Sequence, residues 1–304
     1  MDLIYKAQTR FLFHAHIKIK LSAFYEDDIF DELFAVLEDI DKKYNSYQSG
    51  SYIDLINQGS GGFVKVDDQT IHLLNEVIRL SDFFDGTYDI TIMPLIRLWG
   101  FYKDEQKQIP SNKDIEETRK LVNYKNIEIK GNQVKIGKGQ EIITGSFIKA
   151  YAVDKLVDKL NELGITDAII NAGGSTIRAI NNESHPSWQV MVRHPRNEEL
   201  LFKLDIANQA YSTSSQAKTY VNIEGKEYGH ILNPITGFPS INKQVGIISD
   251  NCMTGDIIST ALFNESLESF LEKVELLSQD YNVKGFLIDS ENRITYTKDF
   301  KIKQ

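Results

Sequence analysis

The order of helix-like and strand-like segments constrains this 304-residue chain more strongly than any other feature of its sequence. Apolar residues alternate along 11–23, which predicts a half-buried strand. Residues 126–136 predict a hairpin that turns at Gly131-Asn132. Helical spacing of apolar residues predicts helices over about 28–44, 68–84, 148–163, 255–263 and 266–278. Because these segments intermix without a strict strand–helix–strand alternation, the sequence predicts an α+β fold with largely antiparallel sheets.

No repeat, low-complexity tract or flexible linker divides the sequence, so residues 1–304 are expected to form one domain. The net charge is −9, from 34 Lys and Arg against 43 Asp and Glu, which argues against binding to nucleic acid or to an anionic membrane. No stretch approaches the ~18 apolar residues of a transmembrane helix, and no signal peptide or lipid-anchor cysteine is visible. As written, the chain is expected in the cytoplasm; a chain trimmed of an export signal would instead belong to the cell envelope.

Among the segments of the sequence, 254–262 has the clearest pattern of side chains that could bind a metal ion. Asp256 and Thr260 stand four residues apart, so on a helix their side chains point to the same side. A carboxylate, a hydroxyl and nearby main-chain oxygens are ligands that Mg²⁺ prefers, and substrate phosphates can complete its coordination. On spacing alone, the simpler interpretation is a helix start in which Asp256 only stabilises the positive end of the helix dipole.

Three further features could meet an anion. His230 enters the turn over 228–239, where it could orient a phosphate or accept a proton, although a histidine before a turn is more often structural. Lys149 is expected in the first turn of a helix, where the dipole disfavours a cation. This unfavourable position hints that it binds an anion, although a solvated lysine is the more common case. Gly173 and Gly174 follow a strand, so their N–H groups could approach a ligand or simply form a turn.

Two segments could hold a flat ring. Residues 86–101 are apolar and aromatic with Asp89 and Thr91 embedded, a mixture typical of the surroundings of a heteroaromatic ligand. The polar stretch 45–57 offers Tyr47 for stacking. Each segment alone is also typical of a core or a helix cap, so neither identifies a site.

Taken together and in this order, these segments resemble the ApbE-like family, the FAD:protein FMN transferases. The resemblance runs from about residue 10 to about residue 265. Its motifs are Gly86-x-x-Asp89-x-Thr91 with Leu98-Trp99-Gly100-Phe101, Lys149 with Tyr151-Ala152-Val153-Asp154, Ala172-Gly173-Gly174, Ser212-Thr213-Ser214, His230 with Pro234-x-Thr236-Gly237, and Asp256 with Ser259-Thr260-Ala261-Leu262. The chain departs from the family pattern at Phe13-His14, where Met-Gly is usual, at Ser175, and over 143–150, where Asp-Leu-Gly-Gly-Ile-Ala-Lys-Gly is usual.

The resemblance implies an ApbE-like, T-fold-related architecture of two intertwined α/β halves, with mainly antiparallel sheets and FAD in the cleft between them. It implies a Mg²⁺ held by Asp256, by Thr260 and by a main-chain oxygen of the 145–149 turn, at Ile148. It implies contacts with FAD for Tyr47, Asp89, Thr91, Lys149, Asp154, Gly173, Gly174, Thr213 and His230. Catalytic roles are implied for His230, Asp256 and Lys149.

The implied activity is Mg²⁺-dependent transfer of FMN from FAD to another protein. The hydroxyl of a Thr or Ser on an acceptor flavoprotein attacks the phosphorus next to riboflavin, and AMP leaves. The same site could use water, as an FAD pyrophosphatase that yields FMN and AMP, or could bind FAD without catalysis. The sequence does not separate these alternatives, because a partner supplies the acceptor hydroxyl.

Overall fold

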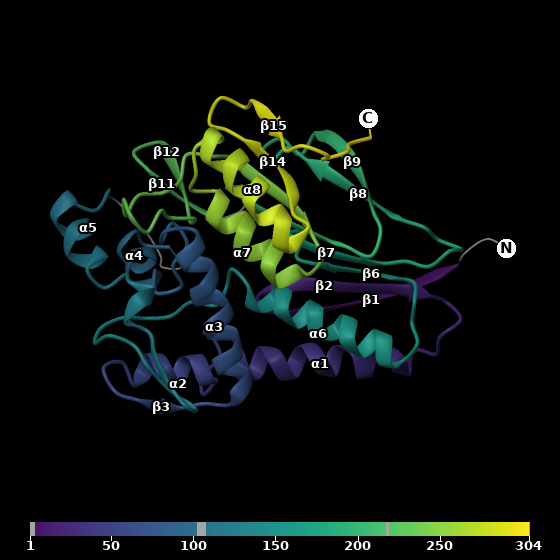
Figure 1. The fold of residues 1–304 in the computed structure, drawn as a ribbon, viewed down its shortest axis with the longest axis horizontal. Coiled ribbons are helices and arrows are strands. Elements are labelled where there is room, and N and C mark those ends of the chain that lie inside the picture. The colour runs from purple at the N-terminus through teal and green to yellow at the C-terminus, as the bar shows by residue number, and fades with distance from the viewer. Residues whose placement is uncertain (1–3, 102–107, 217–218, 304) are drawn as a thin grey trace.

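An eight-stranded sheet forms the centre of the computed structural model, which describes residues 4–101, 108–216 and 219–303 (Figure 1). Neighbouring strands pair antiparallel in the order β1-β2-β6-β7-β10-β13-β14-β15. Their bounds are Tyr5–Leu12, Ala15–Ser22, Ala168–Ala172, Thr176–Ile180, Ala210–Ser215, Gln244–Ser249, Lys284–Ile288 and Ile294–Tyr296. The predicted α+β fold with mainly antiparallel sheets is confirmed.

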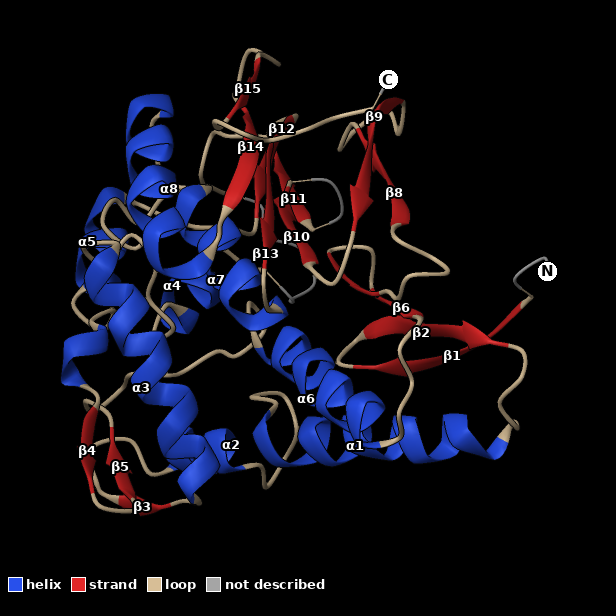
Figure 2. Ribbon diagram, turned by 45° about the vertical axis from the view of Figure 1, so that its right-hand side comes forward, coloured by secondary structure: helices blue, strands red, loops and turns tan. Residues whose placement is uncertain are grey.

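One face of this sheet is covered by α1 (Asp28–Tyr44), α6 (Ile148–Glu162), α7 (Cys252–Leu262) and α8 (Leu267–Tyr281) (Figures 1 and 2). Their apolar sides pack with Ile17, Ile19 and Leu21 of β2 in the largest core cluster. At one side of this layer lies α3 (Asp68–Phe83), which Asp67 caps by accepting a hydrogen bond from the N–H of Thr70 at 2.8 Å. None of the helices within the described ranges is long and apolar enough to cross a membrane.

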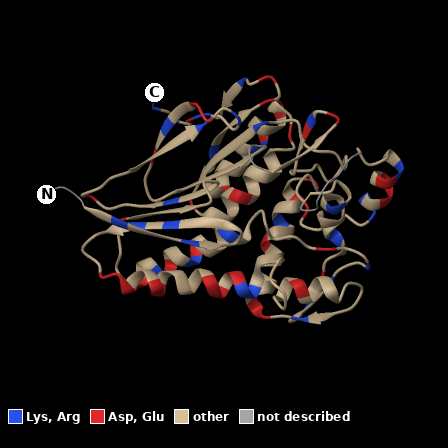
Figure 3. Ribbon diagram, turned by 180° about the vertical axis from the view of Figure 1, so that it is seen from behind, with Lys and Arg blue, Asp and Glu red and all other residues tan. Residues whose placement is uncertain are grey.

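Acidic residues lie along α1 and basic residues along the edge strand β1 (Figure 3), and ion pairs join this strand to the helix and its N-cap. Arg10 pairs with Asp31 and with Glu38, and Lys6 pairs with Asp27. Because the carboxylates of these pairs are at least half exposed, each pair is expected to contribute no more than about 1 kcal/mol. The apolar side of α1 therefore holds the helix in place, and the charged side mainly keeps it hydrated.

The opposite face of the sheet is covered by a hairpin of β8 (Trp188–Arg193) and β9 (Leu200–Ile206) (Figure 2). Inward residues of the hairpin form a second core cluster with strands of the central sheet. Its members are Ile177, Ala179, Trp188, Val190, Val192, Phe202, Leu204, Ile206, Tyr211, Ile248, Phe286 and Ile288. The turn of this hairpin reaches the cavity described below.

A third group of short elements lies beside the sheet. It comprises α2 (Tyr52–Gln58), α4 (Met93–Leu98), α5 (Asn112–Arg119), the 3₁₀ turn Tyr124–Asn126, the small sheet of β3 (Val64–Lys65), β4 (Glu128–Lys130) and β5 (Gln133–Lys135), and the hairpin of β11 (Tyr220–Ile223) and β12 (Lys226–Gly229). Trp99 is fully buried in the core cluster that α4, α5 and β11 share, and its indole N–H donates to the carbonyl of Gly237 at 2.8 Å. This bond fixes the 231–239 turn that follows His230.

The single strand predicted over 11–23 is wrong. The chain reverses at Phe13 and His14, so β1 ends at Leu12 and β2 begins at Ala15. Both turn residues have positive φ, 52° and 56°, in the left-handed region where glycine or asparagine is usual in such a two-residue turn. Neither is glycine, so the alternation of apolar residues runs through the turn and conceals it.

The sheet divides between β7 and β10. These two strands pair only over Thr176–Arg178 and Ala210–Ser212. Beyond this point the N–H of Thr213 still donates to the carbonyl of Ser175 at 2.7 Å, and β10 then runs on without β7 beside it. The division separates one half of the sheet, β1, β2, β6 and β7, from the other half, β10, β13, β14 and β15. A cavity opens between these two halves.

Candidate functional site

The cavity between the two halves has a volume of about 940 Å³. Ten of the residues singled out from the sequence line it: Tyr47, Asp89, Ile148, Lys149, Gly173, Gly174, Thr213, His230, Asp256 and Thr260. They come from loops, from α6 and α7, and from the strand ends at the division of the sheet. Segments far apart in the chain therefore meet around one space of the size typical for ligand pockets.

Thr91 lies outside the cavity wall. It is fully buried, and both its N–H and its hydroxyl donate to Asp89 at 2.7 Å. The other carboxylate oxygen of Asp89 accepts the N–H of Tyr124 at 2.8 Å. Asp89 borders the cavity, but its carboxylate is occupied in holding the 89–91 turn, so the polar residues of this segment order the loop.

Asp154 also lies outside the wall. Its two carboxylate oxygens accept the N–H groups of Cys252 and Met253 at 2.7 and 2.8 Å, in the first turn of α7. Burial raises the pKa of Asp154 to about 6, although these two hydrogen bonds act in the opposite direction. The structure therefore gives Asp154 a positioning role: it fixes the start of the helix that carries Asp256 and Thr260.

The pKa of Asp154 has a measurable consequence for stability. The pKa of this carboxyl is 3.8 in the unfolded chain and about 6 in the folded protein. As the pH rises through this range, the unfolded chain ionises first, so the folded protein loses stability. The free energy of unfolding of the wild type, relative to Asp154→Asn, should fall by up to about 3 kcal/mol between pH 4 and pH 7. Urea titrations of both proteins at the two pH values test this; an unchanged difference would contradict it.

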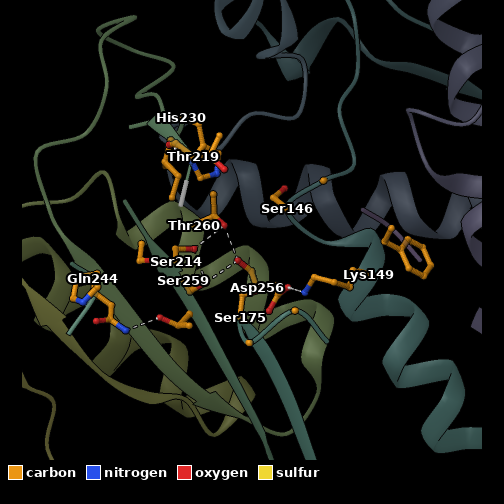
Figure 4. Close-up of a pocket in the computed structure, with 18 of the residues that line it drawn as sticks. Ser146, Lys149, Ser175, Ser214, Thr219, His230, Gln244, Asp256, Ser259 and Thr260 are labelled. Carbon is orange, nitrogen blue, oxygen red and sulfur yellow. Dashed lines mark hydrogen bonds and ion pairs between the residues drawn. The ribbon is translucent and has the colours of Figure 1, made fainter. Parts of the chain in front are cut away.

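Asp256 is held against the sheet by its neighbour Gly255. A Cβ at Gly255 would stand 2.5 Å from Oγ of Ser249 and 2.7 Å from Oγ of Ser212, so only glycine allows α7 to lie this close to β10 and β13. Burial raises the pKa of Asp256, and the nearby Lys149 ammonium opposes this shift. The carboxylate accepts the hydroxyl of Thr176 at 2.8 Å and lies 3.6 Å from Nζ of Lys149 (Figure 4).

Hydroxyl groups form the wall next to Asp256. The hydroxyl of Thr260 donates to the main-chain oxygen of Asp256 at 2.9 Å, so the lone pairs of its Oγ1 remain available as acceptors. This Oγ1 lies 3.1 Å from Oγ of Ser214. Ser214 in turn lies 2.9 Å from Ser259 (Figure 4). The expected pair, Asp256 and Thr260, thus shares the cavity wall, although the carboxylate of Asp256 is turned toward Lys149 and Thr176.

These donors fit a hard divalent cation. Within the described residues, no group of three or more His, Cys, Asp or Glu side chains is placed to hold a metal. One carboxylate with hydroxyl oxygens is, however, the sparse donor set of Mg²⁺ sites that are completed by water and substrate phosphates. The buried carboxylate of Asp256, whose pKa burial raises, would be stabilised in its charged form by a cation.

His230 is half-buried in the wall above Thr260 (Figure 4). Its main-chain N–H and its Nδ1 both lie 3.1 Å from the carbonyl oxygen of Thr219. Nδ1 must donate to that oxygen, so the neutral ring keeps its proton there and presents Nε2 as an acceptor. Loss of solvent lowers the pKa of His230, which favours the neutral form near pH 7.

Several residues of the wall were missed by the sequence reasoning. Ser214 and Ser259 belong to the motifs of the family resemblance but were given no role, and Thr176, whose hydroxyl donates to Asp256, carries no pattern in sequence. Gln244 is 5% exposed; its Nε2 donates to Thr213 at 3.2 Å, and its Oε1 has no partner. An unpaired buried acceptor in a cavity wall is costly without a ligand. Phe13 and His14 also line the cavity, and their departure from the family pattern was the only signal for them.

The fold and the cavity define a class: an α+β protein with a cavity, lined by a lysine, a carboxylate and hydroxyl groups, between two halves of one antiparallel sheet. The ApbE family model matches residues 13–284. An FAD:protein FMN transferase of Vibrio cholerae is 26% identical over 239 residues, which cover 76% of this chain and 71% of that protein. One from Haemophilus influenzae is 26% identical over 261 residues, which cover 81% and 75%.

Solved structures agree with this relationship. The ApbE protein of Thermotoga maritima has a TM-score of 0.89 at 25% identity, covering 97% of this chain and 98% of that chain. The apo form of the flavinyl transferase ApbE of Pseudomonas stutzeri has a TM-score of 0.84 at 25% identity, covering 99% and 98%. The chain belongs to the ApbE family, as its motifs indicated.

Proposed function

We propose that this chain is an FAD:protein FMN transferase. The observation that carries the proposal is the convergence of Lys149, His230, Asp256 and Thr260 on one cavity at the division of the sheet. The relatives named FAD:protein FMN transferase match most of the chain and support the same activity. In this proposal residues 1–304 act as one catalytic domain, since strands of both halves belong to the same sheet.

FAD is proposed to lie across the cavity with its pyrophosphate near the start of α6. Phe147, at the N-cap of this helix, makes no side-chain cap, and both Ile148 and Lys149 line the cavity. The positive end of a helix and a lysine together favour an anion. Tyr47, Gly173, Gly174 and Thr213 border the remaining space and are proposed to contact the dinucleotide.

Mg²⁺ is proposed at Asp256 and Thr260, with a main-chain oxygen at Ile148. When bound, such a cation polarises the phosphates and neutralises charge on the departing AMP. The chain's own contribution is to place the oxygen donors of Asp256 and Thr260, together with the ammonium of Lys149, around the space proposed for the phosphates. Positioning and electrostatics of this kind supply most of the catalysis in phosphoryl transfer.

The transfer step needs an acceptor hydroxyl and a base. The Oγ of a Thr or Ser on the acceptor protein forms a bond to the phosphorus next to riboflavin. The bond from this phosphorus to the bridging oxygen breaks, and that oxygen leaves with AMP. The proton of the hydroxyl passes to Nε2 of His230, which the carbonyl of Thr219 keeps free to accept it.

The proposed activity is tested by incubating the protein with FAD, Mg²⁺ and an acceptor flavoprotein domain. We expect a covalently fluorescent acceptor band on a denaturing gel, together with one AMP released per FMN attached. An unlabelled acceptor, under conditions in which a related flavin transferase labels it, would contradict the proposal. Release of AMP without any acceptor, at the same rate as with it, would indicate a pyrophosphatase instead.

A further inference from the structure

Lys149 and Asp256 form an ion pair inside the cavity, and this pair sets the charge that a ligand meets. Nζ of Lys149 lies 3.6 Å from Oδ2 of Asp256, and their side chains are only 12% and 11% exposed. The ammonium also donates to the hydroxyl of Thr176, which donates to the carboxylate of Asp256 at 2.8 Å. Figure 4 shows the lysine reaching from its helix toward this carboxylate.

Lys149 lies at a position on its helix that is unfavourable for a positive charge. It is the second residue of α6, where the helix dipole disfavours a positive charge. Its side chain is also largely buried, and an unpaired charge is costly to bury. The carboxylate of Asp256 compensates for both effects, so the lysine acts as the cation of the site when no metal is bound.

The charges of the site can be counted. Within the ion pair, Lys149 and Asp256 together carry no net charge. A divalent cation that bound beside Asp256 would leave two positive charges uncompensated in this pair, next to the ammonium. The carboxylate of Asp89 also borders the cavity, but its hydrogen bonds with Thr91 and Tyr124 hold it in its own turn. The two negative charges of a pyrophosphate beside the cation restore the neutrality of the pair. Inside a protein, such an imbalance costs far more than it does in water.

We infer that Lys149 makes the binding of the divalent cation and of the dinucleotide mutually dependent, by repelling the cation until the pyrophosphate arrives. This inference rests on the proposed function and extends it. The lysine is then a positioning residue with opposite effects on the two ligands. It weakens binding of the cation alone, and it strengthens binding of the phosphates.

Binding measurements test this without recourse to activity. Mn²⁺ serves as the probe cation and ADP as the pyrophosphate probe, with calorimetric titrations corrected for Mn²⁺ bound by free ADP. In the wild type we expect ADP to tighten Mn²⁺ binding at least about tenfold. In Lys149→Met we expect Mn²⁺ alone to bind at least about tenfold more tightly than to the wild type, and ADP to bind more weakly.

Two further variants separate charge from structure. Lys149→Arg keeps the positive charge and should keep the coupling between the two ligands. Lys155→Met lies on the same helix but removes an exposed lysine that pairs with Asp158, so it should behave as the wild type. If Lys149→Met binds Mn²⁺ alone no more tightly than the wild type, or keeps the full coupling, the inference is overturned.

The outcome is distinguishable from a failure of the proposed function. A wild type that transfers FMN, but whose coupling survives in Lys149→Met, would overturn only this inference. A wild type that binds ADP and Mn²⁺ with the expected dependence on Lys149, but never labels an acceptor, would overturn the transferase proposal and keep the inference.

Discussion

Asp256→Asn should reduce the rate of FMN transfer by about 10³-fold at saturating FAD. Asp256 supplies the carboxylate at the proposed cation site, and its position is fixed by Gly255 and by Asp154 beneath the helix. Loss of a charged ligand removes several kcal/mol of stabilisation from the charge that develops on the phosphates. Initial rates of acceptor labelling, measured over a range of Mg²⁺ concentrations, test this expectation.

The control for Asp256→Asn is Asp158→Asn on α6, which removes an exposed carboxylate paired with Lys155 and should leave the rate unchanged. Circular dichroism of both variants establishes that they are folded. If folded Asp256→Asn keeps more than about a tenth of the wild-type rate at every Mg²⁺ concentration, the carboxylate does not hold the catalytic cation.

His230→Gln should slow transfer by about 10²- to 10⁴-fold, the usual contribution of a general base. Because loss of solvent lowers the pKa of His230 below 6.5, the ring is neutral and active at pH 7 and becomes protonated only at lower pH. The wild-type rate should therefore stay level from pH 7.5 to pH 6.5 and fall below that value. The variant should lack this acid limb, with the KM for FAD little changed.

The control for His230→Gln is His72→Gln, an exposed histidine on α3 outside the cavity. Its rate and pH profile should match those of the wild type. A midpoint of the acid limb above pH 6.5, or an acid limb that survives in His230→Gln, would assign the titrating group to another residue.

The local elements of this fold follow from sequence patterns, because helical spacing and turn residues act over a few positions. The predicted helices over 148–163 and 266–278 match α6 and α8 within three residues at each end. The turn at Phe13-His14 escaped prediction, because its strained conformation is fixed by the pairing of β1 with β2 rather than by a glycine. Contacts of that kind depend on the whole sheet.

The candidate site also depends on contacts that no local sequence pattern predicts. The misfit of Lys149 in a helix start indicated an anion partner, and the structure supplies one, the carboxylate of Asp256. No local pattern could identify that partner, because the strand order of the sheet brings α6 and α7 together. For the same reason no local pattern showed that Asp154, which the family motif predicts at FAD, accepts the N–H groups at the start of α7.

The most direct test of the proposed site is a crystal structure of the protein with ADP and Mn²⁺, in which the anomalous signal locates the metal. We predict a nucleotide in the cavity between residues 86–101 and 172–176. We also predict a single Mn²⁺ peak in contact with the carboxylate of Asp256, the hydroxyl of Thr260 and a phosphate oxygen. A nucleotide bound in this cavity with its metal elsewhere, or a nucleotide bound outside the cavity, would contradict the proposed site.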